Sequence, residues 1–446
     1  MTGQRRPVRT PRARLAAATI AALVAAAACG GSDDSAATGG DRPLELWTRQ
    51  AEDGLAVYEA IAARYEEETG RAVEVTSVVA DFEQRLTRAA AGGDLPDLVV
   101  NDTAGLGQLV DNGLVEPIDR EEVDGHEDIA DRAWEAARGA DGEYYGVPFS
   151  AHAFVLLMRS DWAASLGLGA PATWDDLRAM AAAFTTGDPD GNGAADTYGL
   201  NVPASTERGY ASWYWTTYLW QAGGDYLDAH DDGTFSPVVD SPEAVESLEF
   251  LQDLVCTDRS VQPDAVNTVT VDAHGNFSGG LTGLYQTGPW MYARYDAELP
   301  AGAFEAVRPP AGPGGDTVMA EGENTYVMTG TDLRDEAVDF AAWLASPDGQ
   351  LAGMNAGGYA VVRLPVNTTL DAAEVYGDER WALAADIYET SGRYVPAVPN
   401  WTPFRQASGE TVNTALADCS ADPQALLDEL NEAFATELEA QGVLAE

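Results

Sequence analysis

The sequence lacks several residue types on which common kinds of site depend. It contains no lysine, because all 25 of its basic residues are arginine. This absence excludes a P-loop with its lysine, a Schiff-base lysine and a Ser–Lys dyad. The chain has only three cysteines and four histidines, and they form no C-x-x-C and no Cys/His cluster with the spacing of metal ligands. No G-x-S-x-G or H-E-x-x-H sequence occurs either.

Basic residues are also few compared with acidic ones. The sequence has 73 aspartates and glutamates, and its formal net charge is −48 at pH 7. Without the five arginines between Arg5 and Arg14, 20 basic residues remain and the net charge is −53. Binding to phosphates requires a basic surface, so nucleic acid is excluded as a partner. The acidic surface primarily serves solvation.

Residues 1–28 have the pattern of an export signal. A basic start from Arg5 to Arg14 precedes an uninterrupted apolar run from Leu15 to Ala28. A membrane-spanning helix needs about 20 apolar residues, so this shorter run is predicted to be cleaved off.

Cys29 follows the apolar run directly and is followed by Gly-Gly-Ser. This arrangement resembles the lipobox of bacterial lipoproteins, although Ala26 stands where leucine is commonest. The resemblance implies that Cys29 becomes the lipidated N-terminus and holds the protein on the extracellular face of the cell membrane. The alternative is an ordinary secretory signal with an incidental cysteine. Residues 29–42 are rich in Gly, Ser, Ala and Asp, which predicts a disordered tether.

Two cysteines remain in the mature chain, Cys256 and Cys419. In an oxidising compartment a pair of cysteines favours one disulfide. The sequence leaves open whether the two residues meet in space.

The mature chain opens with a strand–helix–strand pattern. Residues 44–47 alternate as a strand, apolar residues recur at helical spacing from Leu55 to Tyr65, and valines follow from 73 to 79. A further helix over 82–91 precedes a buried strand that ends at Asn101 and Asp102. Such alternation predicts a mostly parallel sheet covered by helices, with ligands at the carboxyl ends of its strands. Asn101 and Asp102 are therefore candidate ligand contacts, or alternatively helix caps.

The loop over residues 188–196 has a partial calcium-loop pattern. Oxygen-bearing side chains occur at its first, third, fifth and ninth positions, with glycine at the sixth, but Gly199 replaces the bidentate glutamate at position 12. We interpret the loop as a polar turn, with a structural calcium ion as the alternative. The predicted ligands are Asp188, Asp190, Asn192 and Asp196.

Aromatic residues are concentrated in two places. Five of them lie between Trp213 and Trp220, where a helix needs some for its apolar face. Trp290 follows a Gly-Pro turn, which fixes the direction of the residue after it. We therefore regard Trp290 as the best single candidate for a binding aromatic.

Several short motifs, taken in order, resemble the extracellular solute-binding proteins of ABC importers, in particular the carbohydrate-binding group that includes the maltose-binding protein. Each motif is weak alone, but together they cover nearly the whole mature chain. They are Leu44–Trp47, Leu95–Leu98, Tyr145–Pro148, Thr173–Leu177, Thr197–Leu200, Gly288–Trp290, Glu336–Phe340, Ser346–Asp348 and Gly358–Val362.

The resemblance implies an α/β fold of the periplasmic-binding-protein type. Two α/β lobes would be joined by a hinge that the chain crosses more than once, with the ligand in a cleft between them. Mapped onto this chain, the first lobe takes residues 43–149 and 315–362, and the second takes 150–314 and 363–446.

The resemblance also implies a set of ligand-binding residues. Arg405 stands where the closest relatives carry an aromatic, so Trp401 is the alternative stacking residue there. The implied residues are Arg49, Glu52, Asn101, Asp102, Ser150, His152, Trp213, Tyr214, Trp290, Tyr359, Trp401 and Arg405.

The predicted function is capture of a sugar or short oligosaccharide and its delivery to a permease and its ATPase. Sugar rings stack on Trp and Tyr, and their hydroxyls pair with Asp, Asn, Glu and Arg. We expect a monomer with no catalytic residues and no cofactor apart from the calcium alternative. Two other readings stay open, namely an exported glycosidase-like enzyme with paired carboxylates, and a binding protein for a peptide or polyamine.

Overall fold

The computed structural model describes residues 42–50, 52–79, 82–230, 232–355 and 359–445. The predicted leader, Cys29 and the tether up to residue 41 lie outside this part of the chain. Residues from Asp41 onward belong to one compact unit. The strands are β1 (Leu44–Thr48), β2 (Val73–Ser77), β3 (Leu98–Asp102), β4 (Val147–Ala153), β5 (Val155–Met158), β6 (Tyr198–Asn201), β7 (Leu227–Ala229), β8 (Phe235–Pro237), β9 (Thr282–Thr287), β10 (Glu305–Val307), β11 (Val318–Val327), β12 (Leu364–Pro365) and β13 (Gly392–Arg393).

Helices pack around these strands. They are α1 (Glu52–Thr69), α2 (Phe82–Gly92), α3 (Leu106–Asp111), α4 (Asp131–Glu135), α5 (Ser160–Leu166), α6 (Trp174–Thr186), α7 (Ala211–Ala222), α8 (Pro242–Cys256), α9 (Thr270–Ser278), α10 (Tyr292–Glu298), α11 (Arg334–Ala345), α12 (Pro347–Met354), α13 (Ala372–Tyr376), α14 (Arg380–Ser391), α15 (Thr402–Ala417) and α16 (Pro423–Ala440). Within the described ranges, no helix has both the length and the apolar character needed to cross a membrane.

Local sequence explains where several helices begin. At α6, the Thr173 hydroxyl accepts a hydrogen bond from the Asp176 backbone, and the Asp176 carboxylate accepts one from the Thr173 backbone. This capping box satisfies two backbone donors that the first turn otherwise leaves free. Ser241 caps α8 and Asp422 caps α16, each directly before a proline at the first helical position.

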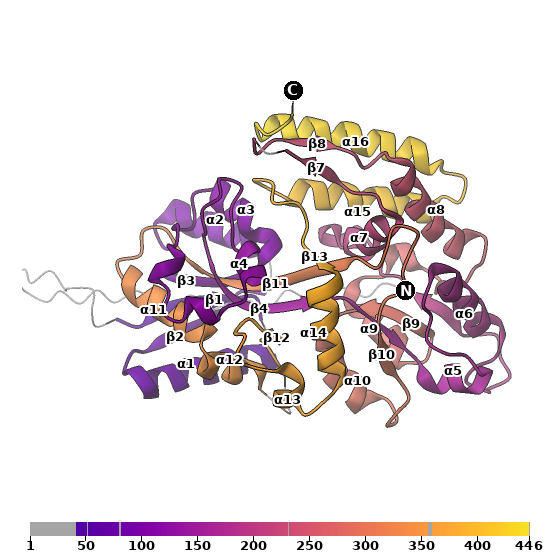
Figure 1. Ribbon diagram of the computed structural model, residues 1–446, viewed down its shortest axis with the longest axis horizontal. Helices are drawn as coiled ribbons and strands as arrows, with labels where there is room; N and C mark the ends of the chain where they lie inside the picture. The colour runs from indigo at the N-terminus through magenta and orange to yellow at the C-terminus, as the bar shows by residue number, and fades with distance from the viewer. Residues whose placement is uncertain (1–41, 51, 80–81, 231, 356–358, 446) are drawn as a thin grey trace, which may run out of the picture. The chain divides into compact units, whose positions relative to one another are not determined.

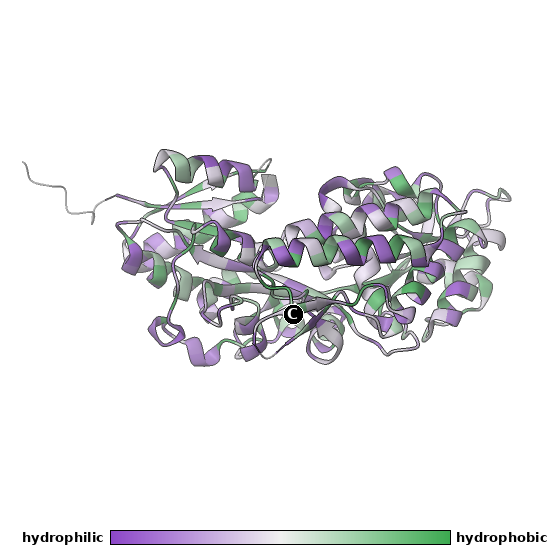
Figure 2. Cartoon of the chain, turned by 90° about the horizontal axis from the view of Figure 1, so that it is seen from above, coloured by the Kyte–Doolittle hydropathy of each residue, from purple (hydrophilic) through white to green (hydrophobic). Residues whose placement is uncertain are grey.

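Two main sheets organise the described residues. The first has the order β12-β4-β11-β3-β1-β2, with β13 paired to β11, and the second has the order β10-β5-β9-β6. β1 pairs in parallel with both β2 and β3, as the strand–helix–strand pattern predicts. Hydrophobic residues of the helices face these sheets while hydrophilic ones face outward (Figure 2). The predicted α/β class is confirmed, since helices cover two main sheets.

The chain crosses between the two sheets three times. β4 of the first sheet continues through Phe154 into β5 of the second, and β10 of the second leads to β11 of the first. The third crossing joins β13 to α15. β4 and β11 lie between the two lobes in Figure 1 and pair antiparallel over residues 147–153 and 320–325.

The structure differs from the predicted lobe assignment over residues 364–391. We expected 363–446 in the second lobe, but β12 pairs with β4 of the first sheet. α14 packs against β4 and β11 of the first sheet and also against β10 of the second, so it lies beside the hinge. These short elements sit beside the hinge strands, and the sequence carried no signal for which sheet they join.

A disulfide joins Cys256 at the end of α8 to Cys419 between α15 and α16. Their Cα atoms are 5.6 Å apart, which lies within the usual range for a bridged pair. The bridge lies wholly within the second lobe, so it leaves the hinge free to move.

Candidate ligand-binding site

The two central hinge strands present a row of polar side chains on one face. His152 of β4 is the register partner of Glu321 of β11, and Ser150 is the partner of Glu323. Directly opposed residues of an antiparallel pair project to the same face, so these four side chains lie together. Neighbouring residues of the two strands, including Ala151 and Ala320, point the other way into the hydrophobic core. The polar row forms the floor of the candidate site, and we call it the polar floor.

The carboxyl ends of β1 and β3 contribute a second polar group beside this floor. The Arg49 guanidinium donates a hydrogen bond to the Asn101 side chain at 3.2 Å and pairs with the Asp102 carboxylate. Burial opposes ionisation of Asp102, but the positive charges of Arg49 and Arg405 hold its pKa below the ordinary value. Asp102 is therefore a carboxylate with its charge already balanced.

Glu323 has a similar partner. Its carboxylate accepts a hydrogen bond from Arg363 at 2.7 Å, and both side chains are almost fully buried. The Arg363 backbone N–H donates to the Ser150 hydroxyl at 3.0 Å. Burial raises the pKa of Glu323, and the Arg363 charge opposes that rise. The pair fixes the end of the polar floor in one arrangement.

The second lobe faces this group with aromatic and cationic side chains. The Tyr210 hydroxyl lies 3.5 Å from an Arg49 nitrogen that donates to it, so the two lobes meet here. The Tyr210 ring packs on Trp213 at 4.3 Å between ring centroids, and the Arg405 guanidinium lies 5.7 Å from the Tyr210 ring centre. Arg405 enters the site from the first turn of α15.

Trp290 borders the polar floor from the second lobe. Its ring centroid lies 4.8 Å from that of His152, in an edge-to-face arrangement. The ring also lines a cavity of about 660 Å³ that Asp53 and Tyr359 of the first lobe help to enclose. Only a glycine fits at position 288, because a Cβ atom there would lie 1.6 Å from a carbon of the Trp290 ring. The Gly-Pro turn therefore fixes the direction of the Trp290 ring, as the sequence predicted.

Several buried polar atoms around the floor have no hydrogen-bond partner among the described residues. They are Nδ1 of His152, Oε1 of Glu321, Nε of Arg405 and Nε1 of Trp213. Burial, together with the nearby Arg363 charge, lowers the pKa of His152 to about 3, so its imidazole is neutral. A buried polar atom without a partner costs free energy, which a ligand with hydroxyl groups can recover.

Comparison with known proteins identifies the family. The sequence model described as bacterial extracellular solute-binding protein matches residues 60–384, well over half of the chain. The chain belongs to this family of solute-binding proteins. A protein of Brucella abortus (strain 2308) that is named only as a binding protein is 23% identical over 359 residues, which cover 78% of this chain and 83% of that protein.

Two further similarities concern named ligands. The maltotriose-binding protein of Pyrococcus abyssi is 24% identical over 323 residues, covering 69% of this chain and 63% of that protein. An ABC transporter solute-binding protein from Thermotoga lettingae, solved with α-D-tagatose, superposes with a TM-score of 0.75 at 20% identity, covering 89% of this chain and all of that one. The structural match places this solute-binding protein in the same fold.

The structure brings together most of the residues predicted for the site. Arg49, Asn101, Asp102, Ser150, His152, Trp213, Trp290 and Arg405 surround the polar floor. Tyr359 is 42% exposed, and its hydroxyl donates to the Gln50 side chain at 3.1 Å. Glu52 begins α1, and its side chain lies outside the described part of the chain.

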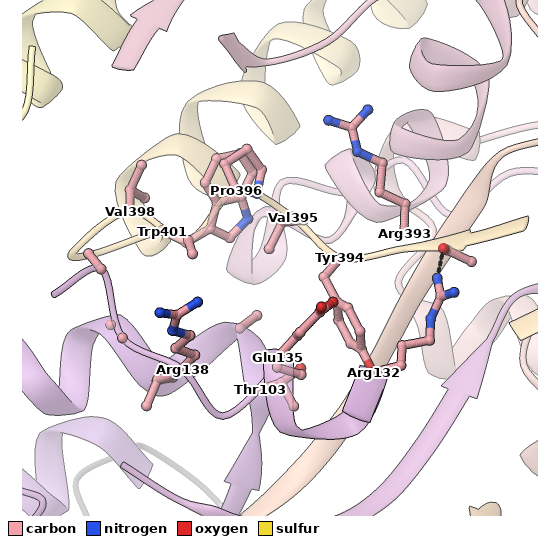
Figure 3. Close-up of a pocket in the computed structure, with 18 residues that line it drawn as sticks. Thr103, Arg132, Glu135, Arg138, Arg393, Tyr394, Val395, Pro396, Val398 and Trp401 are labelled. Atoms are coloured by element: carbon pink, nitrogen blue, oxygen red, sulfur yellow. Dashed lines mark hydrogen bonds between the residues drawn. The ribbon is translucent and has the colours of Figure 1, made fainter. Parts of the chain in front are cut away.

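Two predicted residues lie elsewhere. Tyr214 is buried inside the second lobe, where its hydroxyl faces that of Tyr218 at 3.5 Å. It lies on the face of α7 that packs into the core, one residue from Trp213. Trp401 stacks on Phe404 at 5.4 Å and touches a different cavity, of about 350 Å³, beside the third crossing (Figure 3). That cavity also includes Arg138 and Tyr394.

The prediction missed Tyr210, Glu321, Glu323 and Arg363. The alternation Glu-Gly-Glu inside a strand was the available signal for the two glutamates, since alternate residues share a face. Tyr210 and Arg363 lie in segments with no periodic pattern.

In the loop over residues 188–196, the carboxylates accept hydrogen bonds from other groups of the same loop. The Asn192 amide donates to Asp190 at 2.8 Å and to Asp196 at 3.2 Å, and the Gly193 backbone donates to Asp188. Across the described ranges, no group of three or more His, Cys, Asp or Glu residues is placed to hold a metal ion. The calcium alternative stays a prediction.

Proposed function

We propose that this protein captures a sugar or short oligosaccharide between its lobes and delivers it to the permease of an ABC importer and its ATPase. The observation that carries the proposal is the position of Trp290 beside a floor of polar atoms without partners. An aromatic face suits the C–H face of a sugar ring, and the unpaired atoms suit its hydroxyls. The maltotriose and tagatose of the relatives support the same ligand class.

The polar groups bind and do no chemistry in this proposal. Glu323 and Asp102 each hold an arginine, which leaves neither free to act as an acid or nucleophile at a glycosidic bond. Closure of the lobes is driven by the higher affinity of the closed form for the ligand. Because the polar floor lies on the hinge strands, a bound sugar contacts the elements that the motion bends.

A thermal-shift screen tests the ligand class. The protein from Asp41 onward is melted with maltose, maltotriose, D-tagatose and fructooligosaccharides, with amino acids, peptides and polyamines as controls. A ligand that binds only the folded state raises the Tm by mass action. We expect a rise with one series of sugars and no turnover of chromogenic glycosides. A rise with a peptide or polyamine alone would assign a different ligand, and turnover would make the protein an enzyme.

We further propose that the mature protein is a monomer anchored outside the cell membrane through lipid on Cys29. The support is the sequence of the leader and of the residues that follow it. Replacement of Cys29 with alanine should release the protein from the membrane fraction into the medium, because dual acylation contributes most of the anchoring free energy. A Ser32→Ala variant serves as the control and should stay membrane-bound. Retention of the Cys29→Ala protein in the membrane fraction would exclude the lipid anchor.

A further inference from the structure

Three carboxyl groups lie at the polar floor, and one of them differs from the other two. Asp102 pairs with Arg49, and Glu323 pairs with Arg363. Glu321 is only 5% exposed, and its Oε1 atom has no hydrogen-bond partner among the described residues. Its other oxygen lies 3.9 Å from Nε2 of His152, which is too far for a hydrogen bond.

The neighbours of Glu321 favour its uncharged form. Burial raises its pKa well above the ordinary value, and the negative charges of Asp102 and Glu323 act in the same direction. Arg405 and Arg49 oppose this rise. A buried carboxyl without a counter-charge takes up a proton, because an isolated charge is costly in a medium of low dielectric constant.

Most of the described groups that face Glu321 keep one charge state around neutral pH. His152 on β4 is already neutral, since its pKa is about 3. Tyr394 beside β13 and Tyr326 on β11 both have a pKa raised by burial. Asp102 keeps its charge because its pKa is lowered, and the arginines stay protonated. Glu321 and the paired Glu323 are therefore the carboxyl groups of the polar floor whose pKa is raised.

We propose that Glu321 is a specificity-determining residue that contacts the ligand as an uncharged carboxylic acid, beside the neutral imidazole of His152. This inference rests on the proposed function and names the ligand as an uncharged polyhydroxyl compound. A protonated carboxyl both donates and accepts a hydrogen bond, as does a hydroxyl group, so hydroxyl groups of a sugar suit the unpaired Oε1 of Glu321 and Nδ1 of His152.

The sign of the pH effect follows from the uncharged form. Binding uses the protonated carboxyl, so affinity should fall as the pH rises through the raised pKa of Glu321. The ligand-free protein carries a related signature, because Glu321 is ionised in the unfolded chain at neutral pH and must take up a proton on folding. Its contribution to stability is complete below the unfolded pKa and is lost as the pH rises toward the folded pKa.

Glu321→Gln, Glu321→Ala and Glu323→Gln form a matched set for the test. Glutamine keeps the shape and hydrogen-bonding groups of a protonated glutamic acid but cannot ionise. Without ligand, we expect the Tm of Glu321→Gln to rise relative to the wild type as the pH increases above the unfolded pKa of glutamate, by at most about 1.5 °C per pH unit. Glu323→Gln should lower the Tm throughout, because it leaves the buried Arg363 without its counter-charge.

Titration calorimetry with the neutral sugars of the screen completes the test. We expect Glu321→Gln to bind with nearly wild-type affinity and without the wild-type loss at high pH, and Glu321→Ala to bind at least about tenfold more weakly. Wild-type affinity in Glu321→Ala, or a Tm of Glu321→Gln that runs parallel to the wild type, would overturn the inference. If no sugar binds the wild type, the proposed function fails, while the ligand-free melting curves still decide the protonation state of Glu321.

Discussion

Replacement of Trp290 with alanine is expected to weaken sugar binding by at least about thirtyfold. A buried aromatic anchor at the centre of a binding site contributes roughly 2 kcal/mol or more, and 1.4 kcal/mol corresponds to a tenfold change in Kd. Trp290 is placed for this role, because its half-buried ring packs against His152 of the polar floor and lines the 660 Å³ cavity. Titration calorimetry with the sugar found in the screen measures the change.

A second variant separates loss of the ring from its displacement. Gly288→Ala keeps Trp290 but forces the ring to move, because the new Cβ atom would lie 1.6 Å from it. The backbone at Gly288 has a φ of −100°, which alanine adopts without strain, so the effect arises from the ring alone. We expect a loss of affinity close to that of Trp290→Ala.

Gly169→Ala is the control for the glycine substitution. A Cβ atom at Gly169 meets no atom within 4 Å, and the residue lies outside the site. It should bind sugar as the wild type does. If Gly288→Ala also binds sugar like the wild type, the position of the Trp290 ring does not determine the affinity. If only Trp290→Ala lowers the Tm without ligand, the ring contributes to packing against Phe154 as well as to binding.

The sequence was informative where a local rule determined the geometry. The Gly-Pro turn predicted an oriented tryptophan at 290, and the close contact between Gly288 and the ring explains why. The end of a buried strand predicted that Asn101 and Asp102 lie near a ligand, because the strand pairs in parallel with β1 and the carboxyl ends meet.

Other features of the site depend on contacts between distant segments. Glu321 and His152 become neighbours only through the pairing of β11 with β4, which lie far apart in the chain, and a bulge between Glu323 and Asn324 fixes that register. The core position of Tyr214 depends on which face of α7 meets α8 and α15, whereas the aromatic-rich run from Trp213 to Trp220 has no clear apolar stripe. Helical periodicity cannot sort such a run into core and site.

Removal of the disulfide is expected to cause the largest loss of stability. Cys256 and Cys419 are 163 residues apart, and in the chain-entropy model a loop of this length is worth roughly 5 kcal/mol. For a chain of this size, that corresponds to a fall in Tm of about 6 °C. The Cys256→Ser/Cys419→Ser double variant, compared with the wild type by calorimetry with and without reductant, measures the effect.

A weaker interaction also links α8 to the segment between α15 and α16, and it provides the control. The Gln252 amide of α8 donates to the backbone carbonyl groups of Ala415 at 3.0 Å and Ala421 at 3.2 Å. Gln252→Ala keeps the disulfide and removes these bonds, each worth about 1 kcal/mol, so it should lower the Tm much less. An equal fall in Tm in the two variants would mean that the packing of α8 against this segment, rather than the covalent link, provides the stability.

The position of the disulfide predicts that its loss lowers the Tm without changing the affinity for sugar. Cys419 lies just beyond the C-terminal end of α15, whereas Arg405 enters the site from the first turn of the same helix, more than three turns away. The buried Phe404 and Val412 hold the helix to the second lobe between these two ends. Loss of the disulfide therefore frees the far end of α15 first, and sugar affinity at 25 °C should match the wild type even though the Tm falls. A parallel loss of affinity would show that the whole helix shifts as one rigid element, which would make the disulfide a positioning device for Arg405.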